Sequence, residues 1–438
     1  MSRICMIGTG YVGLVSGACL ADFGHEVWCV DINEQRIKEL HENIMPIYEP
    51  GLDRLVEKNV QAGRLFFTTS LAEAMEKTDV IFIAVQTPMS DSGEADLKFV
   101  LKVAEEIGTL MTKYSVVVTK STVPVGTSRK VKAAIEGAQT KAIEFDMASN
   151  PEFLREGSSI EDFMRPDRVV IGTETDRATE VMRDIYRPLY LLETPIVVSD
   201  IETAELIKYA SNAFLAVKIS YINELSGLAD RVGANISTVA KAMGLDKRIG
   251  PKFLHAGLGY GGSCLPKDTN AIVHIAEEAG GDMSIVRAAI GVNADLPGRA
   301  MEKVEALAAD LQGKTVAMLG LSFKPNTDDI RDAPSRVLVK LFRDAGATLR
   351  VHDPVAMDNF KAIEPDLNYC DGPYDTVEGA DLVCLVTEWN EYRQLDLERL
   401  GDLVADKAFL DCRNVYNADI LGKHGFRYES FGRPQRTL

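Results

Sequence analysis

Short apolar runs alternate with helical stretches along most of the chain, and this alternation predicts an α/β fold. In the first third, apolar runs of strand length lie at residues 3–7, 26–30, 80–85 and 115–119. Continuous apolar runs are typical of strands that are covered on both faces, as in parallel sheets. The stretches between them are long enough for the helices that such sheets require as crossover connections.

The second half of the chain repeats the same pattern. Its runs lie at residues 316–320, 346–353, 380–387 and 407–413, and they echo residues 4–8, 24–31, 78–85 and 116–119. We therefore predict two Rossmann-like doubly wound domains joined by a long central helix. The expected boundaries are 1–200 for the first domain, 201–300 for a central helical domain and 301–438 for the second.

The central helix is predicted over residues 202–232, which hold no proline and no glycine before Gly227. Apolar positions cover much of its circumference, so we expect burial between domains or subunits. Lys208 and Asn212 are four residues apart amid these positions and share a face. A lysine is seldom fully buried without a partner, so the pair indicates a site, unless Lys208 reaches solvent instead. The later helical region, 271–306, is expected to break at Pro297.

A glycine turn follows the first predicted strand. Gly8, Gly10 and Gly13 form the spacing G-x-G-x-x-G before a helix, and Asp31 ends the second strand. This context fits a dinucleotide site: a tight turn, room for the pyrophosphate, close helix packing, and a carboxylate for the ribose. Asp31 favours NAD over NADP, although Arg36 leaves that preference open. The alternative is a glycine turn in an α/β protein that binds no nucleotide.

Polar residues stand where later strands end. Thr87 and Thr122 are placed to touch cofactor or substrate, unless their hydroxyl groups cap the next helices. After the strand expected at 145–149, Glu152 and Glu156 are four residues apart and would share a face of a helix. Such acids indicate either a site or a solvated helix start.

The most informative stretch is 257–268, with the sequence GLGYGGSCLPKD. We interpret its glycines as allowing a ligand to approach the backbone. If a helix starts near Ser263, its N–H groups and Lys267 favour a thiolate at Cys264. Asp268 would lie one turn later, so Cys264 is a candidate nucleophile with a partner acid. The alternative is a turn followed by a buried cysteine.

In the second half, Lys324 and Arg331 replace the glycine turn in the loop after the first strand. Cations in this place suit a phosphate-bearing ligand, although a pair of solvated loop cations would look the same. One half would then hold NAD and the other an anionic substrate, with Cys264 between them.

Composition narrows these possibilities. A net charge of −17 argues against general binding of nucleic acid or anionic membranes. Seven scattered cysteines without a C-x-x-C pair indicate neither a disulfide framework nor a zinc site, and the six histidines are dispersed, so no metal is expected. We expect a cytoplasmic protein without a signal peptide or a membrane span. The last residues, from Phe431, are expected to be disordered.

Five motifs together resemble the nucleotide-sugar 6-dehydrogenases of the UDP-glucose/GDP-mannose dehydrogenase family. They are GxGYVG at 8–13, STVPVGT at 121–127, NPEFLREG at 150–157, GYGGSCLPKD at 259–268 and FKPNTDDIRDAP at 323–334. The resemblance spans nearly the whole chain and is nearest to the branch that acts on UDP-glucose. In the segment DCRN at 411–414, Cys412 replaces the Gly or Ala that is usual there.

The resemblance implies a four-electron oxidation of UDP-glucose to UDP-glucuronate with two NAD. Cys264 would form a thiohemiacetal and then a thioester. Lys208 and Asp268 would stabilise the oxyanion and move the proton, Thr122 would hold a water molecule, and Glu152 would serve hydrolysis. The implied NAD-binding residues are Gly8, Gly10, Tyr11, Val12, Gly13, Asp31, Arg36, Thr87, Thr122, Glu156, Lys267 and Arg331. The implied substrate-binding residues are Glu152, Phe153, Leu154, Lys208, Asn212, Arg248, Phe253, Leu254, Gly257, Gly261 and Lys324, with Asn212 also counted as catalytic.

Other readings remain open. Relatives in the superfamily oxidise GDP-mannose or UDP-N-acetylhexosamines by the same chemistry. A two-electron dehydrogenase of the hydroxyacid type would need no cysteine, and a regulatory NAD-binding protein would need no catalysis. We expect a homodimer or a larger homo-oligomer, because the central helix is apolar on most sides.

Overall fold

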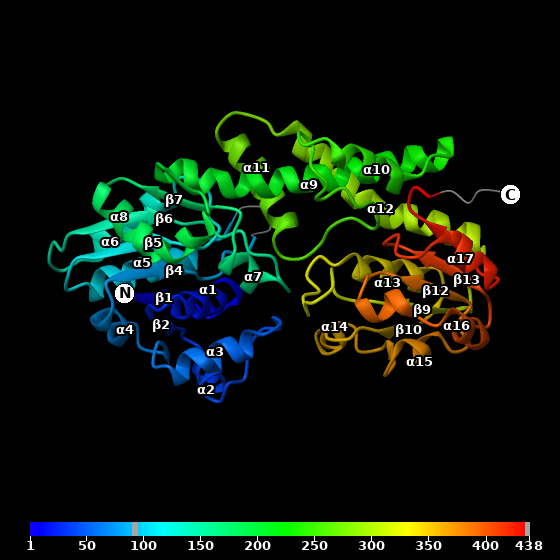
Figure 1. The fold of residues 1–438 in the computed structure, drawn as a ribbon, viewed down its shortest axis with the longest axis horizontal. Coiled ribbons are helices and arrows are strands. Elements are labelled where there is room, and N and C mark those ends of the chain that lie inside the picture. The colour runs from blue at the N-terminus through cyan, green and yellow to red at the C-terminus, as the bar shows by residue number, and fades with distance from the viewer. Residues whose placement is uncertain (90–94, 434–438) are drawn as a thin grey trace. The chain divides into compact units, whose positions relative to one another are not determined.

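The computed structural model describes residues 1–89 and 95–433, and its fold is α/β as the alternation predicts. The chain divides into two compact units (Figure 1). The first comprises residues 1–211 with 274–279, and the second comprises residues 212–273 with 280–438. Each unit is built on one sheet, and helix α9 (Ile201–Val232) joins them, which confirms the predicted architecture.

The first unit holds an eight-stranded sheet in the order β3-β2-β1-β4-β5-β6-β7-β8. Its strands are β1 (Arg3–Ile7), β2 (Glu26–Val30), β3 (Leu65–Thr68), β4 (Val80–Ile83), β5 (Ser115–Thr119), β6 (Phe145–Ser149), β7 (Val169–Thr173) and β8 (Ile196–Ser199). Neighbours from β3 to β6 pair in parallel, whereas β7 pairs antiparallel with β6. The chain reverses strand order after β3, and a sheet of this kind binds ligands at that switch point.

Helices cover both faces of this sheet because strand side chains alternate between the faces. Ile4 and Met6 face α1 (Tyr11–Asp22), α3 (Leu52–Gln61), α7 (Ser159–Met164) and α8 (Asp176–Ile185). Cys5 and Ile7 face α4 (Leu71–Lys77), α5 (Lys98–Leu110) and α6 (Thr127–Ala138). The short helices α2 (Glu34–His41) and η1 (Arg187–Leu192) complete the unit.

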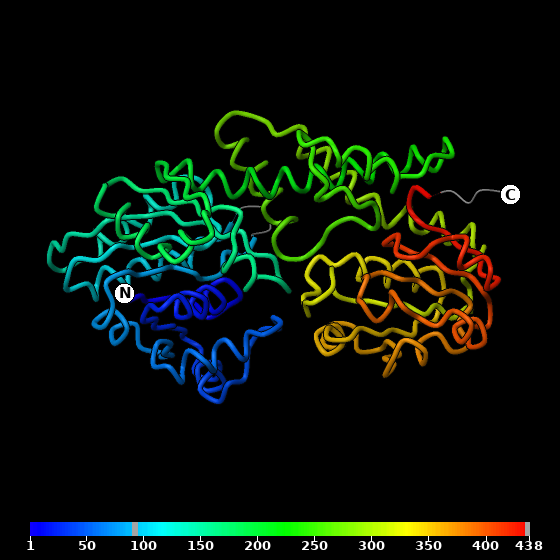
Figure 2. Tube along the Cα trace, in the orientation of Figure 1, coloured from blue at the N-terminus to red at the C-terminus, as the bar shows by residue number. Residues whose placement is uncertain are grey.

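The central helices partly differ from the prediction. In α9, Tyr209 and Ile222 are buried, but Phe214, Tyr221 and Leu228 are exposed, so burial is not all round within this chain. Three helices follow: α10 (Ile236–Leu245), α11 (Leu265–Glu278) and α12 (Ser284–Ala308). The expected break at Pro297 is wrong, because Pro297 lies inside α12 and the break comes at residues 279–283 instead. Figure 2 shows the long irregular segment between α10 and α11.

The second unit holds a six-stranded parallel sheet in the order β11-β10-β9-β12-β13-β14. The strands are β9 (Thr315–Leu319), β10 (Thr348–His352), β11 (Asn368–Tyr369), β12 (Leu382–Leu385), β13 (Ala408–Asp411) and β14 (Arg427–Ser430). The helices are α13 (Pro334–Asp344), α14 (Met357–Ile363), α15 (Pro373–Val377), η2 (Asn390–Gln394), α16 (Leu397–Leu403) and α17 (Ala418–Lys423). Val316 and Met318 pack on one face, and Ala317 and Leu319 pack on the other.

The C-terminal end departs from the expectation of disorder. Phe431 is fully buried in the core beside β9 and β13, and its carbonyl oxygen accepts a hydrogen bond from Asn414 Nδ2 at 2.9 Å. The expected disorder is therefore wrong for Phe431, while residues 434–438 lie outside the described residues. Among the residues described, no helix is both long enough and apolar enough to cross a membrane.

Candidate active site

The turn between β1 and α1 forms a cradle with the shape that a dinucleotide requires. Gly8 has φ +103°, and a Cβ atom on Gly13 would lie 1.9 Å from the Gly8 carbonyl oxygen, so neither position accepts a side chain. A Cβ atom on Gly10 would meet no atom within 4 Å, which leaves open space at the N-terminus of α1. Close packing at Gly8 and Gly13 and room at Gly10 fit a pyrophosphate on the helix N-terminus. Val12 packs against the apolar core beneath the turn.

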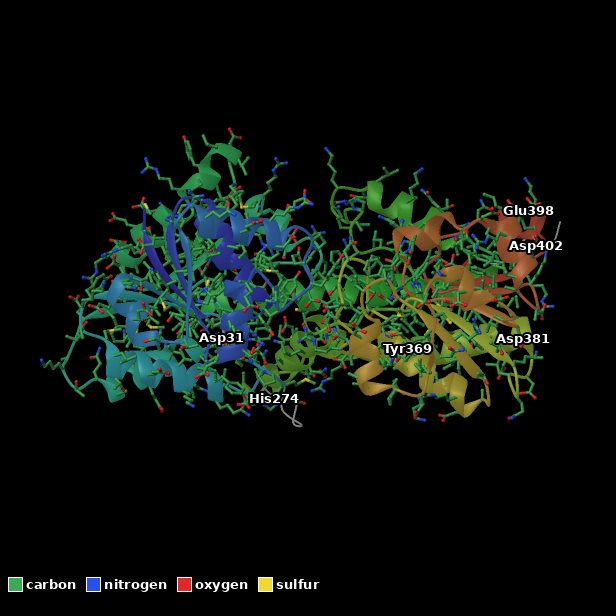
Figure 3. The ribbon with its side chains drawn as sticks, turned by 90° about the horizontal axis from the view of Figure 1, so that it is seen from below. Asp31, His274, Tyr369, Asp381, Glu398 and Asp402 are labelled. Carbon is green, nitrogen blue, oxygen red and sulfur yellow. The ribbon has the colours of Figure 1, made fainter. Side chains whose placement is uncertain are left out.

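Asp31, labelled in Figure 3, follows β2 directly. Its carboxylate accepts hydrogen bonds from the Thr9 backbone N–H (2.9 Å) and hydroxyl group (2.7 Å) and forms an ion pair with Arg36 (3.0 Å). Burial raises the pKa of Asp31, but these bonds, the Asn33 N–H and the Arg36 charge outweigh burial, so the pKa lies below its ordinary value. A carboxylate that stays ionised suits ribose hydroxyl groups and repels a 2′-phosphate.

Glu49 ties the dinucleotide turn to a second segment, and sequence reasoning missed it. The hydroxyl group of Tyr11 donates to Glu49, and Glu49 also accepts from the backbone N–H groups of Gly157 (2.7 Å) and Ser159 (2.8 Å). Burial raises the pKa of Glu49. A cavity of about 350 Å³ borders Glu49 and Gly157. The residue stands alone in the sequence between α2 and α3, so no motif signals it.

Glu152 and Lys208 form a buried ion pair with an Oε1–Nζ distance of 2.8 Å. Lys208 is only 3% exposed, so the alternative in which it reaches solvent is wrong. Glu152 also accepts from the Leu154 N–H at 2.6 Å, and Lys208 Nζ lies 5.6 Å from the centre of the Phe153 ring. Burial raises the pKa of Glu152, but the charge of Lys208 and its hydrogen bond outweigh burial, so the carboxyl group has a lowered pKa.

The segment 150–157 is not helical, because residues 151–155 form no regular structure and α7 begins only at Ser159. The expectation that Glu152 and Glu156 share a helix face is therefore wrong. The bond from the Leu154 N–H to the Glu152 side chain explains the difference, since side-chain bonds of this kind compete with helix formation. Glu152 is buried, whereas Glu156 is partly exposed.

The ends of β4 and β5 bring Thr87 and Thr122 together, and the Thr87 hydroxyl group donates to the Thr122 carbonyl oxygen at 2.9 Å. Beside them, Lys120 follows β5 directly and is buried. Its ammonium group donates to Asn150 Oδ1 at 3.0 Å. Sequence reasoning did not single out Lys120, although this lysine directly follows the strand SVVVT, whose central residues are three valines.

In the second unit, Cys264 immediately precedes α11 and is exposed, whereas the other six cysteines are buried. The alternative of a buried cysteine is therefore wrong. The Cys264 carbonyl oxygen accepts from the Asp268 N–H at 2.8 Å, so Cys264 stands at the N-terminus of the helix. Backbone N–H groups at that position favour negative charge, which suits a thiolate.

Asp268 is buried one turn after Cys264 and is held from two sides. Asn212 Nδ2 donates to Asp268 Oδ2 at 2.6 Å, and Lys267 Nζ donates to Asp268 Oδ1 at 2.7 Å. Lys267, which the resemblance assigns to NAD, thus pairs with Asp268 in this structure. Asn212 orients the acid from α9.

The glycines before Cys264 make room for protein atoms. A Cβ atom on Gly261 would lie 2.2 Å from the Asp332 carbonyl oxygen, and one on Gly262 would lie 2.7 Å from the Phe323 ring. At these two positions the glycines permit close packing against the loop after β9. The approach of a ligand to their backbone stays a prediction. This packing holds the backbone conformation of the residues that precede Cys264.

The predicted substrate segment 253–257 is held by its own unit. Phe253 has φ +62°, Leu254 is buried, and the Gly257 N–H donates to Asn223 Oδ1 at 2.8 Å. Arg413 fastens the neighbouring loop, because its guanidinium group donates to the carbonyl oxygens of Gly259 (3.0 Å), Phe323 (3.2 Å) and Val386 (2.7 Å). Sequence reasoning used Arg413 only as part of a motif and assigned it no role.

Three predicted binding cations lie near side-chain partners. Arg331 forms two 2.8 Å bonds with Asp329, Arg248 pairs with Asp246 at 2.6 Å, and Lys324 Nζ lies 5.2 Å from the centre of the Phe323 ring. The side chains of Arg331 and Arg248 are largely exposed. Across residues 1–89 and 95–433, no three His, Cys, Asp or Glu side chains gather as a metal site would require.

Comparison with known proteins agrees with this geometry. The chain matches the UDP-glucose/GDP-mannose dehydrogenase family in its NAD binding domain (residues 2–190), central domain (202–295) and UDP binding domain (317–418). It is 50% identical to a UDP-glucose 6-dehydrogenase of Rhizobium meliloti strain 1021, covering 99% of this chain and 100% of that protein. It is 43% identical to UDP-glucose 6-dehydrogenase TuaD of Bacillus subtilis strain 168, covering 99% and 94%.

Among solved structures, a UDP-glucose dehydrogenase from Pyrobaculum islandicum matches with a TM-score of 0.90 and 40% identity, covering 96% of each chain. A UDP-D-ManNAc dehydrogenase from Pyrococcus horikoshii matches with a TM-score of 0.86 and 27% identity, covering 98% of this chain and 99% of that one. The matches extend over all three segments of the fold. This chain therefore belongs to the UDP-glucose/GDP-mannose dehydrogenase family.

Proposed function

We propose that the protein oxidises the C6 alcohol of UDP-glucose to the carboxylate of UDP-glucuronate. The observation that carries this proposal is the exposed Cys264 at the N-terminus of α11, with Asp268 held one turn away by Asn212 and Lys267. Full-length similarity to UDP-glucose 6-dehydrogenases supports the choice of substrate. NAD would supply the acceptor for the hydride that leaves C6 at each of the two oxidation levels.

Five side chains of the protein are proposed to carry out the covalent, proton-transfer and hydrolysis steps. The Cys264 sulfur attacks the C6 aldehyde to give a thiohemiacetal, and at the next oxidation level it holds the acid as a thioester. Asp268 and Lys208 take the alcohol proton and stabilise the oxyanion. Thr122 holds a water molecule, and Glu152, as a carboxylate, activates water to hydrolyse the thioester and release Cys264.

The remaining binding residues keep the roles that the resemblance implies. Gly8, Gly10, Gly13 and Asp31 are proposed to hold the NAD pyrophosphate and ribose, with Glu156 near the nicotinamide. Lys324 and the backbone of residues 253–257 are proposed to bind the UDP-sugar. Arg248 is proposed to reach the nucleotide in a neighbouring subunit, which its exposed position supports.

We propose that the protein works as a homodimer or a larger homo-oligomer in the cytoplasm. The exposed residues Phe214, Tyr221 and Leu228 recur every seven positions on α9 and support a helix-to-helix contact. A reducing compartment would keep Cys264 free of disulfides.

The first test counts NADH formed per UDP-glucose consumed by the purified protein with excess NAD. The four-electron route gives two NADH per sugar, and Cys264→Ser abolishes formation of the acid. Cys370→Ser, which changes a buried cysteine directly after β11, serves as the matched control and keeps full stoichiometry. One NADH per sugar would contradict the thioester route, and turnover of only GDP-mannose or a UDP-N-acetylhexosamine would contradict the substrate.

A further inference from the structure

A second buried ammonium group lies near the Lys208–Glu152 pair. Lys120 is 3% exposed, and its Nζ donates to Asn150 Oδ1 at 3.0 Å and to the Tyr186 hydroxyl group at 3.4 Å. Both acceptors are uncharged. Burying an ammonium group without a directly bonded carboxylate costs free energy. Such a residue is therefore a candidate for a functional role.

The charged groups that act on Lys120 are the two residues of the buried ion pair. Lys120 interacts electrostatically with Glu152, which attracts it, and with Lys208, which repels it. Two buried ammonium groups therefore act on one buried carboxylate. Repulsion between like charges is mutual, so a positive Lys120 also repels the ammonium group of Lys208. The same charge favours the ionised form of Glu152.

The position of Lys120 is fixed by several bonds. Tyr186 donates its hydroxyl proton to Asn150 Oδ1 at 2.5 Å, and Asn150 Nδ2 donates to the Val170 carbonyl oxygen at 2.8 Å. The Asn150 N–H donates to Thr119, the last residue of β5. Asn150 thus connects the ammonium group to the start of the segment that carries Glu152.

We propose that Lys120 is a positioning residue for the oxidation, whose ammonium charge, fixed by Asn150 and Tyr186, attracts the Glu152 carboxylate and repels the Lys208 ammonium group. This inference rests on the proposed function, in which Glu152 and Lys208 act on the substrate. Burial, the largest influence, lowers the pKa of Lys120 to about 8. Lys120 is therefore charged at neutral pH and loses its charge as the pH rises through about 8.

The test measures kcat with UDP-glucose and NAD from pH 6.5 to 9.5 in Lys120→Met. At pH 7 we expect a fall in kcat of about 10- to 100-fold, with the KM for NAD unchanged. The ratio of wild-type to variant kcat shrinks towards one above pH 8, because the wild-type lysine is then neutral too. The rising limb of the profile moves to higher pH. Lys130→Met, which removes an exposed lysine from α6, leaves the profile unchanged.

Tyr186→Phe provides a second measurement if Lys120→Met does not fold. It removes one acceptor of the ammonium group, so Lys120 loses its proton at lower pH, and activity falls between pH 7 and 8 but not at pH 6. An active wild-type enzyme whose ratio to Lys120→Met is the same at every pH would overturn this inference alone. A wild-type protein that forms no NADH from UDP-glucose would overturn the proposed function and this inference with it.

Discussion

At the scale of single residues, the candidate site depends on charges that are buried and held by specific bonds. Asp31 is held ionised by Thr9 and Arg36, and Glu152 by Lys208. Removing such charges from water costs free energy, which close partners offset. These groups are therefore the residues at which a single substitution is expected to alter cofactor choice or stability.

Asp31→Asn tests cofactor choice. The amide oxygen still accepts from the Thr9 N–H, but the negative charge disappears and Arg36 is freed from its ion pair. We expect kcat/KM for NADP relative to NAD to rise by about 10- to 100-fold, because a free guanidinium group binds a 2′-phosphate. In the double variant with Arg36→Met the gain should vanish. If the double variant keeps the higher kcat/KM for NADP, Arg36 does not bind the 2′-phosphate.

Lys120→Met also predicts a pH-dependent change in stability. The lysine pKa is about 8 when folded and about 10.4 when unfolded, so the unfolded chain binds more protons between these values and wild-type stability rises with pH across that window. At pH 7 the burial cost is fully present, on the order of 3 kcal/mol, and Met removes it apart from the lost hydrogen bonds. Thermal unfolding should show a higher Tm for the variant at pH 7 and a smaller gain at pH 10. A gain that grows with pH would contradict the shifted lysine.

At the scale of secondary-structure elements, the loops between strands and helices position the candidate site residues. The turn from β1 to α1 requires glycine at Gly8 and Gly13 for packing, but not at Gly10. The loop from β6 to α7 carries Glu152 without helical geometry, and Glu49 bonds to its end at Gly157. Each of these two loops carries residues that the proposed function uses, Gly10 in the first and Glu152 in the second.

Gly10→Ala and Gly13→Ala form a matched pair for this turn. Gly10 has φ −73° and open space, so alanine should leave the Tm within a few degrees while its methyl group intrudes where the pyrophosphate belongs. We expect NAD to bind at least about 10-fold more weakly to Gly10→Ala, by calorimetric titration. Gly13→Ala should lower both the Tm and NAD binding, since its Cβ would collide with Gly8. Equal losses of Tm in the two variants would refute the distinction.

At the scale of the whole molecule, two units with one sheet each are connected through α9. Similar strand patterns in the two halves fold into similar sheets, and only the first carries the glycine cradle. The exposed apolar side chains of α9 belong to neither core. An exposed apolar row of this kind is typical of a contact surface, because its burial would remove apolar area from water.

Phe214→Glu tests the proposed oligomer. Phe214 is 63% exposed, so the substitution should not disturb the fold, but it would bury a charge in a helix-to-helix contact. Analytical ultracentrifugation should show the wild type as a dimer or larger and the variant shifted towards the monomer. Ile420→Glu, an exposed position on α17, serves as the control. A wild-type protein that is monomeric at micromolar concentration would contradict the proposal.

The sequence by itself determined the fold class and the presence of an NAD-binding domain, and it indicated the candidate nucleophile. Apolar runs of strand length specify buried strands because side chains alternate across a sheet that is covered on both faces, and G-x-G-x-x-G in that context leaves few other folds. The glycine-rich approach to Cys264, followed by Lys267 and Asp268, indicated the helix start that the structure has at Leu265. These signals are local, so they can be read along the chain.

Only the tertiary structure decided which charged groups meet. Glu152 pairs with Lys208 across 56 residues, and Lys120 bonds to Asn150 across 30 residues, so neither contact follows from local spacing. Pro297 remains inside α12, and one face of α9 stays exposed, because the packing of neighbouring elements overrides local preference. Local pattern fixes the elements, but burial and charge pairing depend on which elements come together in space.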